Sequence, residues 1–472
     1  MLPELAARQK SEIANHASAI MTQKSLLLNF VIRAHGSHAG GWRHTSAPAS
    51  ALTTLDYYRN LVKTAEHGLF DLVFLTDTLS LSRDPVEALQ WPLDPVLLMA
   101  ALSAETSHIG LIATHSTTFN APFNSARLFA SLDHLSNGRA GWNVVTSTGD
   151  ATAQNFGGQT ITEHDARYRQ AGEYLDAVLA LWHSWEPDAI IDDKTGGTLV
   201  RQDGIRAVNI KGEHYAVRGP LNTPPGPQGV PLLSQAGSSE AGRDLAARYA
   251  DIVYAFHTDL ADAKAYRDDL RRRASQIGRD PDTLRLLPGI VPYVASTEAE
   301  AKELRRELFE LDNPQAQIEK AGKLLGLDLS HRDLKKPVDW EQIIARRAHW
   351  GDAVRVERLL ATARNAEAPT TFGELILGLD LRFQHRSLVG TPEQVADYLQ
   401  QGLEIDAFDG VSVIPPVLPG GLDDFVDQVV PVLQARGVHK RTYGEGPLRQ
   451  RLSLRQWDVD GTSFSSHYGS AA

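Results

Sequence analysis

A short run of small and hydroxyl-bearing residues, Ala236–Ser239, stands directly before a predicted helix, Glu240–Ala250. Glycine lets a ligand approach the backbone closely, and a helix start presents unpaired N–H groups at the positive end of the helix dipole. With the Ser238 and Ser239 hydroxyls as further donors, the segment suits a phosphate monoester. Serines are also good N-cap residues, and taken alone the pattern more often indicates an ordinary helix start.

A second polar group lies at the start of another predicted helix, Ala166–Trp185. The spacing of Thr162 and Asp165 resembles a capping box with aspartate in place of glutamate. His164 and Tyr168 are four residues apart and therefore share a helix face, so both can reach one anion. A surface histidine beside a half-buried tyrosine gives the same pattern, and the spacing alone favours that interpretation.

The elements that must position these residues alternate between short β-branched runs and longer segments of helical period, which is typical of βαβ units with a parallel sheet. The first predicted strand is not followed by the GxGxxG spacing of a dinucleotide-binding domain. We therefore predict one α/β fold, a (β/α)8 TIM barrel with insertions. The predicted strands are Leu26–Arg33, Asp71–Asp77, His108–Ser116, Arg139–Ser147, Pro231–Ser239, Asp251–His257, Leu284–Ala295 and Asp409–Val417.

The predicted barrel spans residues 25–440, between an N-terminal arm at 1–24 and a C-terminal arm at 441–472. Turn residues within 188–218 predict an inserted hairpin before the fifth strand. A charged, mostly helical stretch at about 296–388 is too long for one crossover, so we expect an insertion that acts as a lid.

Barrel active sites lie at the carboxyl ends of the strands, so polar residues at those ends are candidate site residues. We expect them to surround one cavity. They are His35, His38 and His44 after the first strand, Asp77 at the second, Thr114, His115 and Ser116 at the third, Asn143 and Ser147 at the fourth, and His257 at the sixth.

Several other chemistries are disfavoured by the sequence. It has no cysteine, no HExxH and no HxH after the first strand, so no metal site is expected. It has neither a GxSxG nucleophile elbow nor a GxxxxGK[ST] phosphate loop. The net charge of −11 argues against nucleic acid as a partner. No apolar run is long enough to cross a membrane and the first residues are polar, so a cytoplasmic location is expected.

With these residues in place, the sequence resembles flavin-dependent monooxygenases of the bacterial luciferase superfamily, in the family of nitrilotriacetate monooxygenase component A. Other members of that family oxygenate EDTA, dibenzothiophene sulfone and long-chain alkanes. The resemblance covers about residues 25–440. Its motifs are Phe74–Asp77, Ala113–Asn120, Leu132–Arg139, Gly141–Ser147, Asn155–Gly157, His164–Tyr168, Gln235–Ser239 and Val413–Gly420.

The resemblance implies a luciferase-like barrel that binds FMN at its mouth. Asp77 and Thr114 would contact the ring end of the cofactor, and Asn143 would line the same cavity. His164, Tyr168, Ser238 and Ser239 would hold the phosphate end. Reduced FMN would come from a separate NAD(P)H:FMN reductase, and O2 would supply the oxygen for a small organic substrate.

For proton transfer at the barrel mouth, the expected catalytic residues are His44 and His115, with Asn143 beside the cofactor. A homodimer or homotetramer is expected, as is common among luciferase-like barrels. Two alternatives stay open: a deazaflavin-dependent dehydrogenase of the same superfamily, and a flavin-binding protein without turnover. Polar, histidine-containing loops mildly disfavour a long alkane as substrate and leave amines, sulfones and heteroaromatics.

Overall fold

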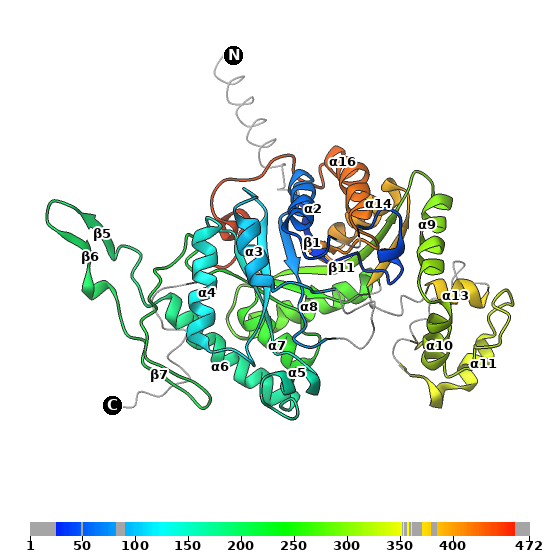
Figure 1. Ribbon diagram of the computed structural model, residues 1–472, viewed down its shortest axis with the longest axis horizontal. Helices are drawn as coiled ribbons and strands as arrows, with labels where there is room; N and C mark the ends of the chain where they lie inside the picture. Colours follow the sequence, from blue (N-terminus) through cyan, green and yellow to red (C-terminus); the bar gives the residue numbers. More distant parts are fainter. Residues whose placement is uncertain are drawn as a thin grey trace, which may run out of the picture.

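The fold is a closed barrel of eight parallel strands surrounded by helices (Figure 1). The computed structural model describes residues 25–48, 51–81, 90–257, 259–351, 353, 356–357, 360, 371–378 and 385–457. Strands pair in the order β10-β9-β4-β3-β2-β1-β13-β11, and the pairing of β11 with β10 closes the barrel. All eight predicted strands are confirmed. They are β1 (Leu27–Ile32), β2 (Leu72–Leu75), β3 (Gly110–Ser116), β4 (Ala140–Val145), β9 (Leu232–Gln235), β10 (Ile252–Ala255), β11 (Arg285–Val294) and β13 (Gly410–Val413).

The helices that follow the strands form the outer layer. They are α2 (Leu55–His67), α3 (Pro95–Ser103), α4 (Pro122–Leu135), α6 (His164–Trp182), α7 (Glu240–Tyr249), α8 (Leu260–Gln276), α14 (Pro392–Glu404), α15 (Gly420–Asp424) and α16 (Val430–Ala435), the last two joined by a π-helical turn at Phe425–Val429. The sequence pattern does not indicate α3, because nearly all of its residues are apolar and no amphipathic period is visible.

Successive residues of each strand face opposite sides of the barrel wall. Phe30, Ala113 and Trp142 belong to the large apolar layer between the strands and the helices. Val31 and Ile112 belong instead to a second apolar cluster, which fills the barrel interior. This alternation decides which side chains at the strand ends can reach the barrel mouth.

The amino-terminal end of the barrel is closed by the chain segment that follows α16. Leu448 begins the short helix α17 (Leu448–Arg451) and packs into the interior cluster. Arg449 forms two hydrogen bonds to Asp251, at 2.9 and 2.7 Å, and both side chains are buried. The described part of the C-terminal arm, up to Trp457, therefore contributes to the core, whereas the predicted N-terminal arm lies outside the described residues.

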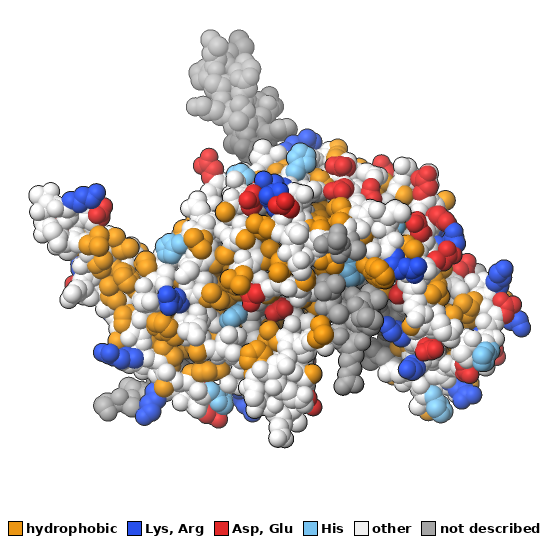
Figure 2. Space-filling model, in the orientation of Figure 1, with side chains coloured by type: hydrophobic (Ala, Val, Ile, Leu, Met, Phe, Trp, Pro, Cys, Tyr) orange, Lys and Arg blue, Asp and Glu red, His pale blue; other side chains and the backbone are white. Residues whose placement is uncertain are grey.

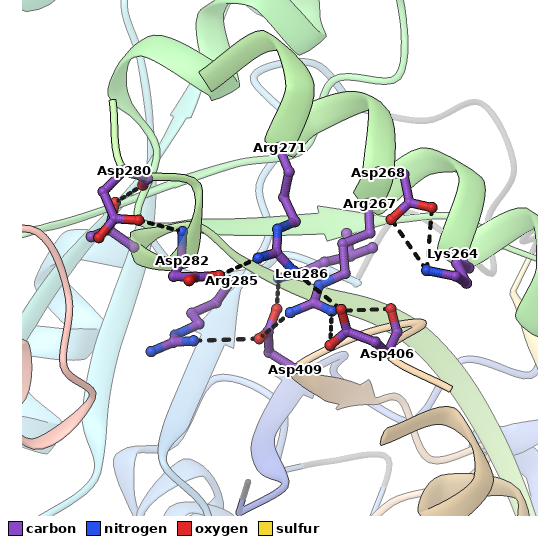
Figure 3. Close-up of polar contacts among 11 residues, drawn as sticks. Lys264, Arg267, Asp268, Arg271, Asp280, Asp282, Arg285, Leu286, Asp406 and Asp409 are labelled. Carbon is purple, nitrogen blue, oxygen red and sulfur yellow. Dashed lines mark hydrogen bonds and ion pairs between the residues drawn. The ribbon is translucent and has the colours of Figure 1, made fainter. Parts of the chain in front are cut away.

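A second ionic network at the same end of the barrel connects α8 to the strands (Figure 3). Arg267 donates to Asp409 Oδ1 at 2.8 Å and also pairs with Asp406. The other oxygen of Asp409 accepts the backbone N–H of Leu286 at 2.9 Å. Arg271 pairs with Asp406 and Asp282. The network holds α8 to the start of β11 and to the residues before β13.

Two antiparallel hairpins occupy the stretch 188–218, where the sequence predicts one. They consist of β5 (Ile190–Asp193) with β6 (Thr198–Val200), and of β7 (Ile210–Lys211) with β8 (Ala216–Val217). The first hairpin extends away from the barrel (Figure 1). Its Ile190 and Leu199 side chains are 53% and 65% exposed, and hydrophobic surface gathers near its base (Figure 2).

The stretch after β11 contains helices that form a small core of their own, set to one side of the barrel (Figure 1). The described helices are α9 (Glu298–Leu311), α10 (Pro314–Leu325), α11 (Trp340–Ala345) and α13 (Phe372–Gly378), and the chain returns through β12 (Arg386–Gly390), which pairs with Ile290–Val294 of β11. Within the described ranges, no helix combines the length and the apolar character needed to span a bilayer.

We expect Arg449→Met to lower the free energy of unfolding by about 3–5 kcal/mol, because Asp251 would be left buried without its counter-charge. Urea unfolding followed by circular dichroism measures the change. Arg441→Met is the matched control, since Arg441 is exposed, and it should change stability by less than about 0.5 kcal/mol. Equal losses in the two variants would contradict a stabilising role for the pair.

Candidate functional site

A cavity of about 260 Å³ opens at the carboxyl ends of β3, β4 and β9. This is the end of the barrel at which active sites occur. Its wall includes Asp77 after β2, Thr114 on β3, Tyr168 on α6 and Gly237 before α7. The remaining lining residues are Thr78, Leu79, Ser116, Val144, Val145, Thr146, Ser147, Thr148, Thr152, Gln235 and Ala236.

One end of the cavity is formed by the turn that leads into α7. A Cβ atom on Gly237 would lie 2.5 Å from Gln235 Nε2, 2.8 Å from Tyr168 Oη and 2.9 Å from the backbone Cα of Gly242, so a larger residue there would force the turn or these side chains to shift. Ser239 is the N-cap of α7, and its hydroxyl accepts the N–H of Gly242 at 3.2 Å. The Tyr266 hydroxyl donates to the Gly237 carbonyl at 2.8 Å and fixes the turn. A helix start with a close-fitting glycine suits an anionic oxygen group such as a phosphate.

The start of α6 brings Tyr168 to the same end of the cavity. The ring of His164 lies against that of Tyr168, with centroids 4.8 Å apart, and His164 Nδ1 is 2.6 Å from Asp165 Oδ1. The predicted capping box from Thr162 to Asp165 is wrong. Glu163 is the N-cap, and its carboxylate accepts the N–H groups of Asp165 and Ala166.

Thr114 of the cavity wall belongs to a chain of hydrogen bonds along the strand ends that includes Asn143, which is not itself a lining residue. The Thr114 hydroxyl donates to the Leu75 carbonyl at 2.7 Å and accepts from Asn143 Nδ2 at 2.9 Å. Asn143 is 3% exposed, and its Oδ1 atom has no hydrogen-bond partner among the described residues. A buried acceptor of this kind is suited to a donor on a ligand, because leaving it unmatched costs free energy.

Asp77 is the carboxylate on the cavity wall. Its Oδ1 accepts the N–H of Thr78 at 2.8 Å. Burial, with a smaller contribution from the charge of Asp94, raises the pKa of Asp77 to about 7. Asp77 is therefore a cavity group that can hold a proton near neutral pH.

Two predicted catalytic histidines do not line the cavity. His115 directs Nε2 to Ser125 Oγ at 2.9 Å, and its ring packs against Phe129 and Trp142 in the layer outside the barrel wall. Its neighbour Thr114 faces inward, so strand alternation turns His115 away from the cavity. His44 hydrogen-bonds to Ser46 at 2.8 Å and lies 3.9 Å from Glu307 of α9.

Ser116 and Ser147, both predicted from their positions at strand ends, line the cavity, and the Ser147 hydroxyl donates to Ser116 Oγ at 2.8 Å. Ser147 adopts a φ of 52°. Other lining residues, such as Thr78, Thr146 and Thr148, were not among the predicted site residues. Thr152 lies on the short helix α5 (Asp150–Asn155), and no sequence feature points to it. In the described part of the chain, no three His, Asp or Glu side chains are grouped to hold a metal.

Comparisons with known proteins give a consistent result. A family model described as luciferase-like monooxygenase matches residues 34–407. The chain is 40% identical to N-acetyl-S-(2-succino)cysteine monooxygenase of Bacillus subtilis, over 92% of this chain and 98% of that protein. It is 41% identical to nitrilotriacetate monooxygenase component A of Aminobacter aminovorans, over 91% of this chain and 97% of that protein. A solved structure of riboflavin lyase with modified FMN and riboflavin superposes with a TM-score of 0.77 at 32% identity, covering 93% of this chain and 99% of that one.

We expect Asp77→Asn to stabilise the ligand-free protein at pH 8 by about 1–2 kcal/mol, a value discounted for the partial exposure of Asp77. The folded state holds the pKa of Asp77 near 7 against an ordinary value of 3.8. Ionisation therefore opposes folding increasingly as the pH rises through this window, and the gain should vanish below about pH 4.

Urea unfolding of the Asp77→Asn variant at pH 8 and pH 4 measures this difference. Asp203→Asn is the control, because its side chain is 76% exposed, and its effect should be small at both pH values. A stabilisation by Asp77→Asn that is the same at both pH values would argue against a raised pKa.

Proposed function

The chain belongs to the luciferase-like monooxygenase family, and from this we propose that it is the oxygenase component of a two-component system. Membership of this family confirms the resemblance seen in the motifs, and the chain is accordingly an oxidoreductase. We propose that it takes reduced FMN from a separate NAD(P)H:FMN reductase and uses O2 to oxygenate a small organic substrate. The observation that carries the proposal is the strand-end cavity, which offers an anion site at one end and polar groups at the other.

The α7 end of the cavity fits the phosphate of FMN. Gly237 leaves room that a Cβ would fill, and the first turn of α7 presents backbone N–H groups. We assign the Ser238 and Ser239 segment and the Tyr168 hydroxyl to this end, with the His164 ring packed at a tilt against that of Tyr168. One helix N-terminus, that of α7, can bind one phosphate group, and FMN carries a single phosphate. The modified FMN in the riboflavin lyase structure supports the choice of cofactor.

We assign Asp77, Thr114 and Asn143 to the ring end of the cofactor. The buried Asn143 Oδ1 atom has no protein partner among the described residues and fits a ring N–H. Asn143 and the Leu75 carbonyl together fix the orientation of the Thr114 hydroxyl. Reduced flavin, when bound, supplies the chemistry that activates oxygen.

The protein's own contribution is to exclude water, to position the substrate and to hold a proton. Asp77 carries the proton at its carboxyl oxygen in this proposal, because its pKa is close to neutral and it lies on the cavity wall. The positions of His44 and His115 give no support to the direct role that the sequence predicts for them. His115 instead packs the wall behind Thr114.

The proposed activity is tested by oxygen uptake with the purified chain, FMN, NADH and a generic flavin reductase, across a panel of organic substrates. We expect one product to carry a single oxygen atom from 18O2. Hydride transfer to a deazaflavin without oxygen uptake would favour the dehydrogenase alternative. Tight flavin binding with no substrate-dependent oxygen use would favour a binding protein without turnover.

We expect Gly237→Ala to weaken the binding of reduced FMN at least tenfold, because the new Cβ would enter the space between Gln235 and Tyr168. Anaerobic titration with reduced FMN measures the dissociation constant. Gly172→Ala on α6 is the matched control, since its added Cβ would meet nothing closer than Tyr249 Oη at 3.8 Å. Equal affinities in the two variants would contradict the assignment of the α7 turn to the phosphate.

A further inference from the structure

Two stacked side chains hold the turn that leads into α7, and one of them comes from α8, which packs beside α7 (Figure 1). The Tyr266 hydroxyl donates to the Gly237 carbonyl at 2.8 Å, and Arg243 Nε donates to the Ser238 carbonyl at 3.0 Å. The guanidinium carbon of Arg243 lies 4.9 Å from the ring centroid of Tyr266. The two side chains therefore hold two successive backbone carbonyls just before the helix.

The held carbonyls decide where the neighbouring N–H groups point. In a trans peptide unit, the C=O and N–H bonds point in opposite directions. The Gly237 carbonyl shares its peptide unit with the N–H of Ser238, and the Ser238 carbonyl shares its unit with the N–H of Ser239. Both N–H groups therefore point away from the side chains that hold the carbonyls. Within the described ranges neither of them donates to a protein acceptor, and Gly237 of the same turn lies on the cavity wall.

The charges around this turn are paired between α7 and α8. Arg243 Nη1 lies 3.1 Å from Asp269 Oδ2, and Arg273 lies 2.9 Å from the same oxygen and 2.5 Å from Glu240. The pairing with Arg273 partly offsets the charge of Glu240, which would repel an anion at the start of α7. Burial raises the pKa of Tyr266 to about 12, against the opposing charge of Arg243, so its hydroxyl keeps the proton that it donates.

Resting on the proposed function, we propose that Tyr266 and Arg243 are positioning residues for the cofactor phosphate. They act through the turn, because the carbonyls that they hold direct the N–H groups of Ser238 and Ser239 toward the phosphate oxygens. Donors that are already oriented lose less conformational entropy when the ligand binds. The pair thereby sets the preference of the chain for reduced FMN over reduced riboflavin, which has the same ring system but no phosphate.

Anaerobic titration of the full chain with reduced FMN and with reduced riboflavin tests this inference. We expect the parent chain to bind reduced FMN at least tenfold more tightly, because charge-assisted hydrogen bonds to the phosphate are strong. Tyr266→Phe keeps the ring beside Arg243 and removes the donor, so it should weaken the binding of reduced FMN about fivefold. Its affinity for reduced riboflavin should stay within about twofold of the parent value, because riboflavin has no phosphate to place at the turn.

Tyr443→Phe is the matched control, because the Tyr443 hydroxyl donates to the Phe70 carbonyl at 2.7 Å at the amino-terminal end of the barrel. This substitution also removes a hydroxyl donor from a backbone carbonyl, and its affinity for reduced FMN should stay within about twofold of the parent value. An unchanged FMN affinity in Tyr266→Phe would overturn the inference. So would an equal loss of affinity for FMN and riboflavin, since that is the result of a merely structural role.

Two substitutions of Arg243 separate its hydrogen bond from its charge, and they decide the outcome if Tyr266→Phe does not fold. Arg243→Gln places an amide N–H at the position of Nε without the charge, so it should keep the FMN affinity within about twofold. Arg243→Lys keeps the charge and places a methylene group there, so it should weaken the binding of reduced FMN about fivefold. The reverse order, with lysine active and glutamine impaired, would show that the charge itself binds the phosphate and would overturn the positioning role.

The titrations of the parent chain separate this inference from the proposed function. If the parent prefers reduced FMN while Tyr266→Phe and Arg243→Lys keep its affinity, only the positioning role is defeated. If the parent binds the two flavins equally, the assignment of the α7 turn to the phosphate fails, and this inference fails with it. If the parent binds neither reduced flavin, the proposed function itself is defeated.

Discussion

Closure of the sheet between β10 and β11 is the constraint on which the site depends. In a closed barrel, every strand residue faces either the interior or the helix layer, and no strand can shift by one residue without exchanging the two sets. Thr114 and His115 show the effect, because one reaches the cavity and the next packs against Phe129 and Trp142. Because the barrel is closed, only those polar residues at the strand ends that face the interior can reach the cavity.

The same constraint explains what the sequence can and cannot predict. The eight strands follow from short apolar runs between turn residues, and all eight are found. Parallel strands buried on both faces are apolar throughout, however, so their sequences do not show which residues point inward. The orientation of His115 could not be predicted for this reason. The N-cap of α6 is Glu163 and not the predicted Thr162, because both side chains can accept N–H groups and the structure uses Glu163. The helix begins at His164, two residues before the predicted start at Ala166.

Buried polar groups at the two ends of the barrel differ in the partners that they have. At the amino-terminal end, Asp251 and Asp409 are matched by arginines at hydrogen-bonding distance. At the carboxyl end, the Asn143 Oδ1 atom has no partner among the described residues, and Asp77 has a raised pKa. This difference matches the usual location of active sites at the carboxyl ends of the strands in this fold. Contacts such as that of Tyr254 with His385 could not be predicted from spacing, because only folding brings their distant segments together.

The pairing of Arg449 with Asp251 has a consequence for biosynthesis. The two residues are 198 positions apart in the chain. During translation Asp251 leaves the ribosome well before Arg449 does, and Leu448, which packs beneath the interior cluster, emerges with the arginine. The amino-terminal end of the barrel therefore cannot close until Leu448 and Arg449 have been synthesised. Until then the nascent polypeptide presents an open apolar interior, and transiently exposed surface of this kind favours aggregation.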